Sequence, residues 1–177
     1  MKKNYDSPEF ITKHTGESTG SSLNAKKSIR ELLDSESFAV LSTQGDGQPY
    51  SSLISFAFSD DLKKLAFATP AGTRKLELML KSDRVSILID NRAAAPESLN
   101  SICAVTLTGR ASVIKESKES EKWALELISA HPYLKAFVKA PGTVIILVEA
   151  ENYFFVKNFQ EVTAWNPDQD REEGDNQ

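Results

Sequence analysis

Between about residues 25 and 160, most hydrophobic positions of the chain alternate with small or polar ones. Ile54, Phe56 and Phe58 show this period of two, which is typical of a strand with one buried face. Turn-forming residues separate the alternating segments. The predicted strands are 37–43, 50–58, 64–69, 84–90, 102–114 and 143–148, the last continued through 153–159.

Three segments have a helical period instead. Asn24 is a plausible N-cap for a first helix, with its apolar face toward a sheet. Thr73 begins a short second helix, and a third covers 117–130, where His131 and Pro132 end it. The apolar residues expected on the buried side of the second helix are Leu76, Met79 and Leu80.

Six strands with mostly short links, and a helix between the third and fourth, predict a mainly β fold. We expect a six-stranded antiparallel barrel with helices outside it rather than a doubly wound parallel sheet. Gly109, inside a long strand, predicts a bulge or bend. The predicted organisation is a flexible arm at 1–22, one folded domain at 23–165 and an acidic disordered tail at 166–177.

Composition narrows the possible functions. The chain has 177 residues and a formal net charge of −4, all of which resides in the segment 168–175, so the remainder is neutral. No basic stripe is present, and we expect no nucleic-acid partner. A lone cysteine, Cys103, and the absence of an apolar leader or membrane-length run predict a cytoplasmic protein with no membrane partner. His14 and His131 are too far apart to indicate a metal site.

The sharpest chemical feature is the segment 68–75, where a strand ends, a turn follows and a helix starts with two adjacent cations, Arg74 and Lys75. Free N–H groups at a helix start, its positive dipole end and an Arg fork suit a phosphate dianion. Without an anion, two cations there oppose the dipole. The alternative is that both side chains simply extend into solvent.

A second feature is a strand that contains Ser51, Ser52 and Ser55, where a fully buried strand would have apolar residues. Small hydroxyl residues leave room for a flat polar ligand, although an exposed strand face also commonly carries serine. Thr69 has the same ambiguity. Trp165, next to the polar tail, is a candidate for an interface or for ligand stacking.

Together these segments resemble the pyridoxamine 5'-phosphate oxidase-like FMN-binding split-barrel family. The likeness extends over about residues 25–160 and depends on the order and spacing of several short motifs. They are Gly47-x-Pro49-Tyr50, Leu65-x-Phe67-x-Thr69, Gly72-Thr73-Arg74-Lys75, Asp83-Arg84-Val85-Ser86-Ile87-Leu88 and Gly109-x-Ala111.

The resemblance implies a six-stranded antiparallel split barrel that forms a homodimer, with FMN in each of two grooves at the subunit interface. Arg74 and Lys75 match positions that hold the FMN phosphate, and Thr73 belongs to the same motif. Further matching positions lie beside the isoalloxazine and act mainly through backbone groups; in this chain they are Ser52, Leu53, Ile54 and Ser55. Two more matching positions near the cofactor are Ala68 and Thr69.

The sequence also departs from true pyridoxamine phosphate oxidases, which have an Arg at the position of Ser52 and a C-terminal Trp-Gly-Gly-x-Arg segment where this chain has 153–159. We therefore expect an FMN-dependent oxidoreductase that acts on a different, unidentified small molecule, with no side chain evident as a general acid or base. Two alternatives stay open: a deazaflavin F420-binding reductase, and a flavin- or haem-binding carrier or sensor without turnover.

Overall fold

The structure is a computed structural model that describes residues 19–94, 101–158 and 161–168. Most of the predicted arm at 1–22 and of the tail at 166–177, and also His14, lie outside these residues. In chain order the elements are α1 (Thr19–Ser35), β1 (Ala39–Thr43), β2 (Tyr50–Ile54), β3 (Ala57–Phe58), β4 (Lys64–Pro70), α2 (Arg74–Lys81), β5 (Arg84–Asp90), β6 (Ala104–Val113), α3 (Ser117–Ala130), the 3-10 helix η2 (Pro132–Leu134), α4 (Lys135–Val138), β7 (Thr143–Lys157) and β8 (Glu161–Trp165).

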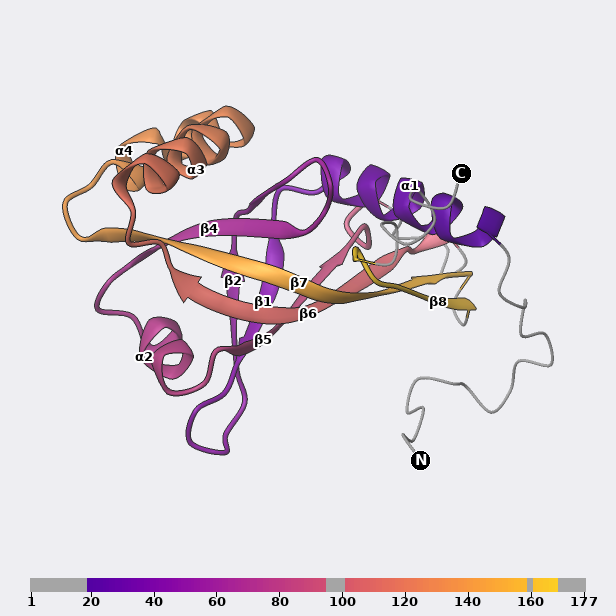
Figure 1. The fold of residues 1–177 in the computed structure, drawn as a ribbon, viewed down its shortest axis with the longest axis horizontal. Helices are drawn as coiled ribbons and strands as arrows, with labels where there is room; N and C mark the ends of the chain where they lie inside the picture. Colours follow the sequence, from indigo (N-terminus) through magenta and orange to yellow (C-terminus); the bar gives the residue numbers. More distant parts are fainter. Residues whose placement is uncertain (1–18, 95–100, 159–160, 169–177) are drawn as a thin grey trace.

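The strands form one antiparallel sheet that curls into a half-barrel (Figure 1). Their order is β2-β1-β5-β6-β7-β4-β3, and β8 pairs with β7 beside this path. The two end strands, β2 and β3, are separated in sequence only by Ser55 and Phe56. Such a short link requires the two ends of the sheet to lie close together, so the sheet must curve. The predicted mainly β, antiparallel split-barrel fold is confirmed.

The number of strands differs from the prediction, because eight rather than six occur in the described residues. The predicted strand at 50–58 is interrupted at Ser55 and Phe56, which pair with no strand and leave β2 and β3 as separate elements. β8 was not predicted, and the two predicted pieces at the end of the domain form one continuous strand, β7. The first helix also begins earlier than expected, at Thr19 rather than after Asn24.

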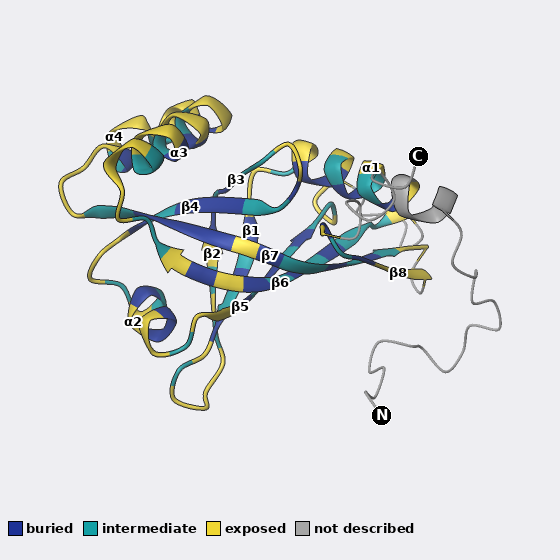
Figure 2. Cartoon of the chain, viewed as in Figure 1, coloured by how far each residue is buried: buried dark blue, intermediate teal, exposed yellow. Residues whose placement is uncertain are grey.

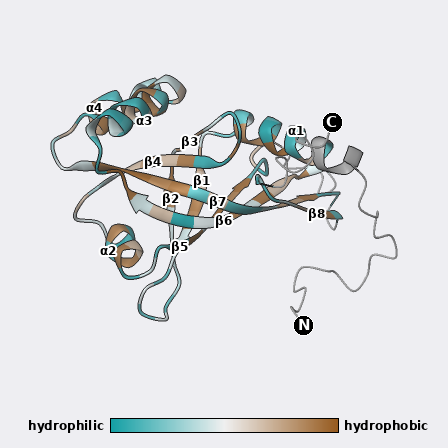
Figure 3. Cartoon of the chain, viewed as in Figure 1, coloured by the Kyte–Doolittle hydropathy of each residue, from teal (hydrophilic) through white to brown (hydrophobic). Residues whose placement is uncertain are grey.

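Alternation along the strands places the core inside the half-barrel. One cross-strand row on the inner face shows this clearly, since every member except Ser52 is almost completely buried. The row runs Ser52, Leu41, Ile87, Leu107, Tyr153 and Trp165. Figure 3 shows hydrophobic residues along β4 and β7, which continue this core. Trp165 is therefore a core residue with 3% exposure, and the prediction of an interface or ligand-stacking role for it was wrong.

The helices cover different parts of the sheet. α1 contributes Ile29 and Leu33 to the barrel core, whereas α3 and α4 build a second cluster on the other side of β4 and β7, around Trp123 and Leu127. The sides of α3 and α4 that face away from the sheet are exposed (Figure 2). In the described part of the chain, no helix has the length and apolar character needed to cross a membrane.

Candidate functional site

The start of α2 is the candidate anion site. Thr73 is the N-cap residue, with φ −98° and ψ 147°, but its side chain does not cap the helix. Its hydroxyl instead donates to the Pro70 carbonyl at 3.1 Å and lies 3.1 Å from the hydroxyl of Thr69. Since the first N–H groups of a helix have no intrahelical acceptor, the uncapped start of α2 can bind an anion.

Two cations at this helix start have no acidic partner among the residues that the structure describes. In the described residues, no ion pair involves Arg74 or Lys75, whereas Lys81 at the other end of the same helix pairs with both Asp46 and Glu77. Arg74 is exposed, and its guanidinium carbon lies 5.1 Å from the centre of the Tyr50 ring. Cations at a helix start are unfavourable for the helix dipole unless an anion compensates them.

The loop between β1 and β2 holds the C-terminal end of α2. Lys81 Nζ donates to the Asp46 carboxylate at 2.9 Å, and Gln44 Nε2 donates to Ser82 Oγ at 3.2 Å. The hydrogen bonds from Lys81 to Asp46 and Glu77 raise the pKa of the ammonium group. Gly45 lies so close to α2 that an added Cβ would approach Leu78 and Lys81 at 3.1 Å. The loop therefore fixes the C-terminal end of α2, while the contact of Arg74 with Tyr50 brings the start of the helix to the beginning of β2.

β2 offers an unusual surface, because it is an end strand of the sheet. It pairs only with β1 among the described residues, so alternate backbone N–H and C=O groups along its second edge have no strand partner. Ser52 Oγ is buried and has no hydrogen-bond partner in the described chain. An unpaired buried hydroxyl is costly, which makes it a notable feature next to a free strand edge.

The structure brings only some of the predicted site residues together. Thr69 and Thr73 are in contact, and Arg74 reaches Tyr50, a residue of the first motif that was not predicted to contact the site. Lys75 is half-buried and follows Arg74 in the first turn. The signal that could have identified Tyr50 was its aromatic side chain at the start of a predicted strand, directly after Pro49.

Other predicted residues point elsewhere. Leu53 is 65% exposed on the outer face of β2, and Ile54 is buried in the core, so only its backbone is accessible for a ligand. Ala68 packs against the second cluster under α3, away from the face that carries Thr69. Ser55 is half-buried in the link after β2.

In chemical terms, the site combines an uncapped helix start, two cations that have no acidic partner among the described residues, and a strand edge that has no strand partner there. The first two features suit a phosphate-type dianion, and the third suits a ligand with hydrogen-bonding groups along one edge. Within the described residues, no group of histidine, cysteine and acidic side chains could hold a metal ion.

Fold and site together define a small split-barrel protein with a candidate anion-binding helix start. The family model of pyridoxamine 5'-phosphate oxidase matches residues 25–157. This match extends over most of the chain, and the chain belongs to the pyridoxamine 5'-phosphate oxidase family. No curated protein matches the sequence significantly.

Several solved structures share the fold. A heme binding protein from Mycobacterium smegmatis aligns with a TM-score of 0.72 and 15% identity. The alignment covers 81% of this chain and 58% of that one. A Clostridium acetobutylicum protein related to general stress protein 26 aligns with a TM-score of 0.64 and 17% identity, over 82% of this chain and 96% of that one. An FAD-binding protein from Mesorhizobium loti aligns with a TM-score of 0.59 and 18% identity, over 73% and 91%. Similarity at these identities shows the fold alone.

Proposed function

We propose that this protein binds FMN and acts as an oxidoreductase on a small molecule. The observation that carries the proposal is the pair Arg74 and Lys75, which lie without acidic partners in the described chain at the uncapped start of α2. A phosphate dianion would relieve their unfavourable interaction with the helix dipole. Family membership and the FAD-binding Mesorhizobium loti neighbour support a flavin in particular.

The residues present fit this cofactor in two places. The start of α2 would hold the phosphate, with Arg74 and Lys75 as charged donors and Thr73 nearby. The free edge of β2 from Ser52 to Ile54, continued by Ser55 in the link, would bind the polar edge of the ring system, and Ser52 Oγ would gain a partner that it lacks within the described chain. When bound, FMN supplies hydride or single-electron transfer, while the protein contributes binding and orientation.

We further propose that the functional unit is a homodimer formed through the outer face of the sheet. A cross-strand row on this face is apolar at most positions and begins at Leu53, which is 65% exposed. The row lies next to the free edge of β2, so a second copy docked on it would also cover the candidate cofactor site. Its members are Leu53, Val40, Leu88, Thr106, Phe154 and Ala164.

The phosphate assignment is tested by the double variant Arg74→Ala with Lys75→Ala in a fluorescence titration with FMN. Each lost charge-assisted contact costs about 1.5–3 kcal/mol, so we expect the Kd to rise by about a hundredfold or more. The matched control is Lys118→Ala with Lys122→Ala, which removes the same charge from exposed positions of α3. An equal Kd for the site variant and the control would refute the assignment.

Turnover is tested separately from binding. Anaerobic addition of NADH or NADPH to the FMN-loaded protein should bleach the flavin absorbance if the protein is an oxidoreductase that takes electrons from a nicotinamide. A bound flavin that no nicotinamide or other donor reduces would favour a carrier or sensor, and a higher affinity for F420 than for FMN would favour the deazaflavin alternative.

A further inference from the structure

The link Ser55–Phe56 is the point where the two ends of the sheet meet, and no strand pairs with it among the described residues. A buried backbone carbonyl at such a break needs a hydrogen-bond partner from elsewhere. The Phe56 carbonyl has one, because it lies 2.8 Å from Nε2 of His131, a residue 75 positions later in the chain. His131 is 3% exposed and Phe56 is also 3% exposed, so this polar contact is buried.

The chemistry of the contact defines the tautomer of the ring. A carbonyl oxygen only accepts, so Nε2 of His131 must carry the hydrogen. In a neutral ring Nδ1 is then an acceptor, and the Tyr133 hydroxyl lies 3.4 Å from it. The rings of His131 and Tyr133 also meet edge to face, with centroids 5.8 Å apart. Both ring nitrogens of His131 therefore have partners, which leaves neither one for a ligand.

His131 is itself firmly held. It terminates α3, and its backbone N–H donates to the Leu127 carbonyl at 2.9 Å while its own carbonyl accepts from Leu134 N–H at 2.9 Å. Leu127 lies in the second cluster, which also contains Ala57 of β3. The end of α3 is thus packed against the strand that directly follows the link.

We propose that His131 is a positioning residue for the cofactor site: its Nε2–H holds the Phe56 carbonyl and so fixes the end of β2 that would bind the flavin ring. The inference rests on the proposed function, because β2 supplies the free edge used there. Only one residue, Ser55, separates the end of β2 from Phe56, so a rotation of the Phe56 peptide would displace the backbone groups of Ile54 and Ser55.

The test compares three variants of the full chain in FMN titrations. His131→Leu removes the donor at similar volume, and we expect the Kd for FMN to rise about three- to thirtyfold. His131→Gln restores an N–H donor and should recover most of the affinity. Tyr153→Phe is the matched control, since it also deletes a buried side-chain hydrogen bond to a carbonyl, that of Leu62, but away from β2. It should lower the Tm and leave the Kd unchanged.

A second readout needs no flavin. Amide hydrogen exchange of the unliganded protein should accelerate in peptides spanning 50–58 for His131→Leu, and in peptides spanning 59–64 for Tyr153→Phe. If His131→Leu fails to fold, Tyr133→Phe takes its place, because it removes only the hydroxyl that contacts Nδ1 of His131. Amide exchange in peptides spanning 50–58 should then also accelerate. Unchanged exchange at 50–58 or an unchanged Kd would overturn the proposal. If the wild-type chain does not bind FMN, the proposed function fails, and the exchange data still decide whether His131 holds β2.

Discussion

Gly109 lies where β6 passes so close to β7 that no side chain fits. A Cβ at this position would lie 2.1 Å from the Glu149 carbonyl oxygen and 3.0 Å from its carbon. The register between the two strands shifts between Thr108 and Gly109, which confirms the predicted bulge. Because the obstacle is backbone of a central strand, it cannot move aside as a flexible side chain could.

We therefore predict that Gly109→Ala lowers the free energy of unfolding by about 2–3 kcal/mol, since overpacking forces the two strands apart. Urea denaturation measures this change. The control is Gly142→Ala, because a Cβ there would meet nothing within 4 Å. Equal stability of the two variants would show that β6 and β7 are not this close.

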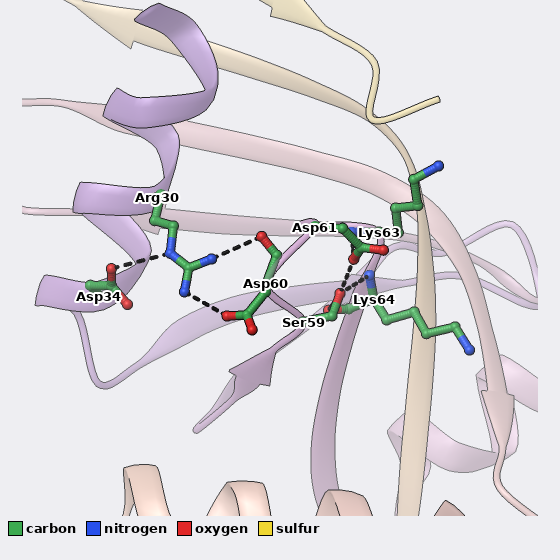
Figure 4. A network of polar contacts seen from close by, with 7 residues as sticks. All are labelled: Arg30, Asp34, Ser59, Asp60, Asp61, Lys63 and Lys64. Atoms are coloured by element: carbon green, nitrogen blue, oxygen red, sulfur yellow. Dashed lines mark hydrogen bonds and ion pairs between the residues drawn. The ribbon is translucent and has the colours of Figure 1, made fainter. Parts of the chain in front are cut away.

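At the scale of elements, a polar network connects α1 to the turn between β3 and β4 (Figure 4). Arg30 donates to the Asp60 carbonyl at 2.8 Å and to its carboxylate at 2.9 Å. Within the turn, the Asp61 carboxylate accepts from Ser59 Oγ at 2.6 Å and from Lys63 N–H at 3.0 Å. The turn is thus fixed by its own side chains and tied to the helix that covers the barrel core.

The pKa of Asp61 is lowered by this arrangement. Partial burial acts to raise it, but the hydrogen bonds from Ser59 and Lys63 and the charge of Lys63 together outweigh burial and bring the pKa below its ordinary value of 3.8. A carboxyl whose pKa is lower in the folded state stabilises the fold above its unfolded pKa, and this contribution is lost as the pH falls through the folded pKa.

The resulting prediction concerns Asp61→Asn, which keeps the shape and cannot ionise. Near pH 7 the variant should be less stable than the wild type by at most about 1 kcal/mol, because Asp61 is largely exposed to solvent. The difference should shrink once the pH drops below 3.8 and disappear below the folded pKa. Urea unfolding from pH 7 to pH 2.5 measures it; a difference that stays constant over this range would contradict the assignment.

Elements whose signals lie within their own segment could be predicted from the sequence, whereas those set by contacts with distant residues could not. The helix at 117–130 and the strand at 84–90 were predicted with the observed bounds, because a strong period and clear end signals lie within each segment. β8 was missed since only Trp165 of its five residues is buried, which leaves little alternation to detect. In α2, Leu80 is 73% exposed and Leu78 is buried instead. Leu78 is buried because it packs close to Gly45, a contact between residues far apart in the sequence.

The candidate site shows the same limit. The cations at the start of α2 were evident from the order of residues, since a helix start and its first turn are local features. Two contacts were not evident from the sequence: that of Arg74 with Tyr50 and the hydrogen bond from His131 to the Phe56 carbonyl. Each joins positions that only the curled sheet brings together. The free edge of β2 likewise depends on the strand order of the complete sheet.

At the scale of the whole molecule, the outer face of the sheet is divided into parallel rows of different character. The apolar row that begins at Leu53 lies beside a polar row, in which Ser42 Oγ and Ser51 Oγ are 3.4 Å apart. The polar row consists of Ser51, Ser42, Ser86, Thr108 and Asn152. Such a pattern gives a docking surface both hydrophobic area and hydrogen-bonding groups that fix its register.

We predict that Leu53→Glu converts the proposed dimer into monomers, because it places a charge at the apolar row that a second copy would bury. Leu125→Glu on α3 is a closely matched control, since both leucines are 65% exposed. Sedimentation velocity distinguishes the species. A wild-type protein that sediments as a monomer, or a dimer that persists in Leu53→Glu, would exclude this face as the interface.

The most direct test of FMN binding is an equilibrium titration of the wild-type chain with FMN, followed by desalting and an absorption spectrum. Binding at the start of α2 predicts a saturable change with one FMN per chain, and a yellow protein that retains flavin bands after desalting. A chain that is folded but shows no saturable binding and emerges colourless would contradict the proposed function.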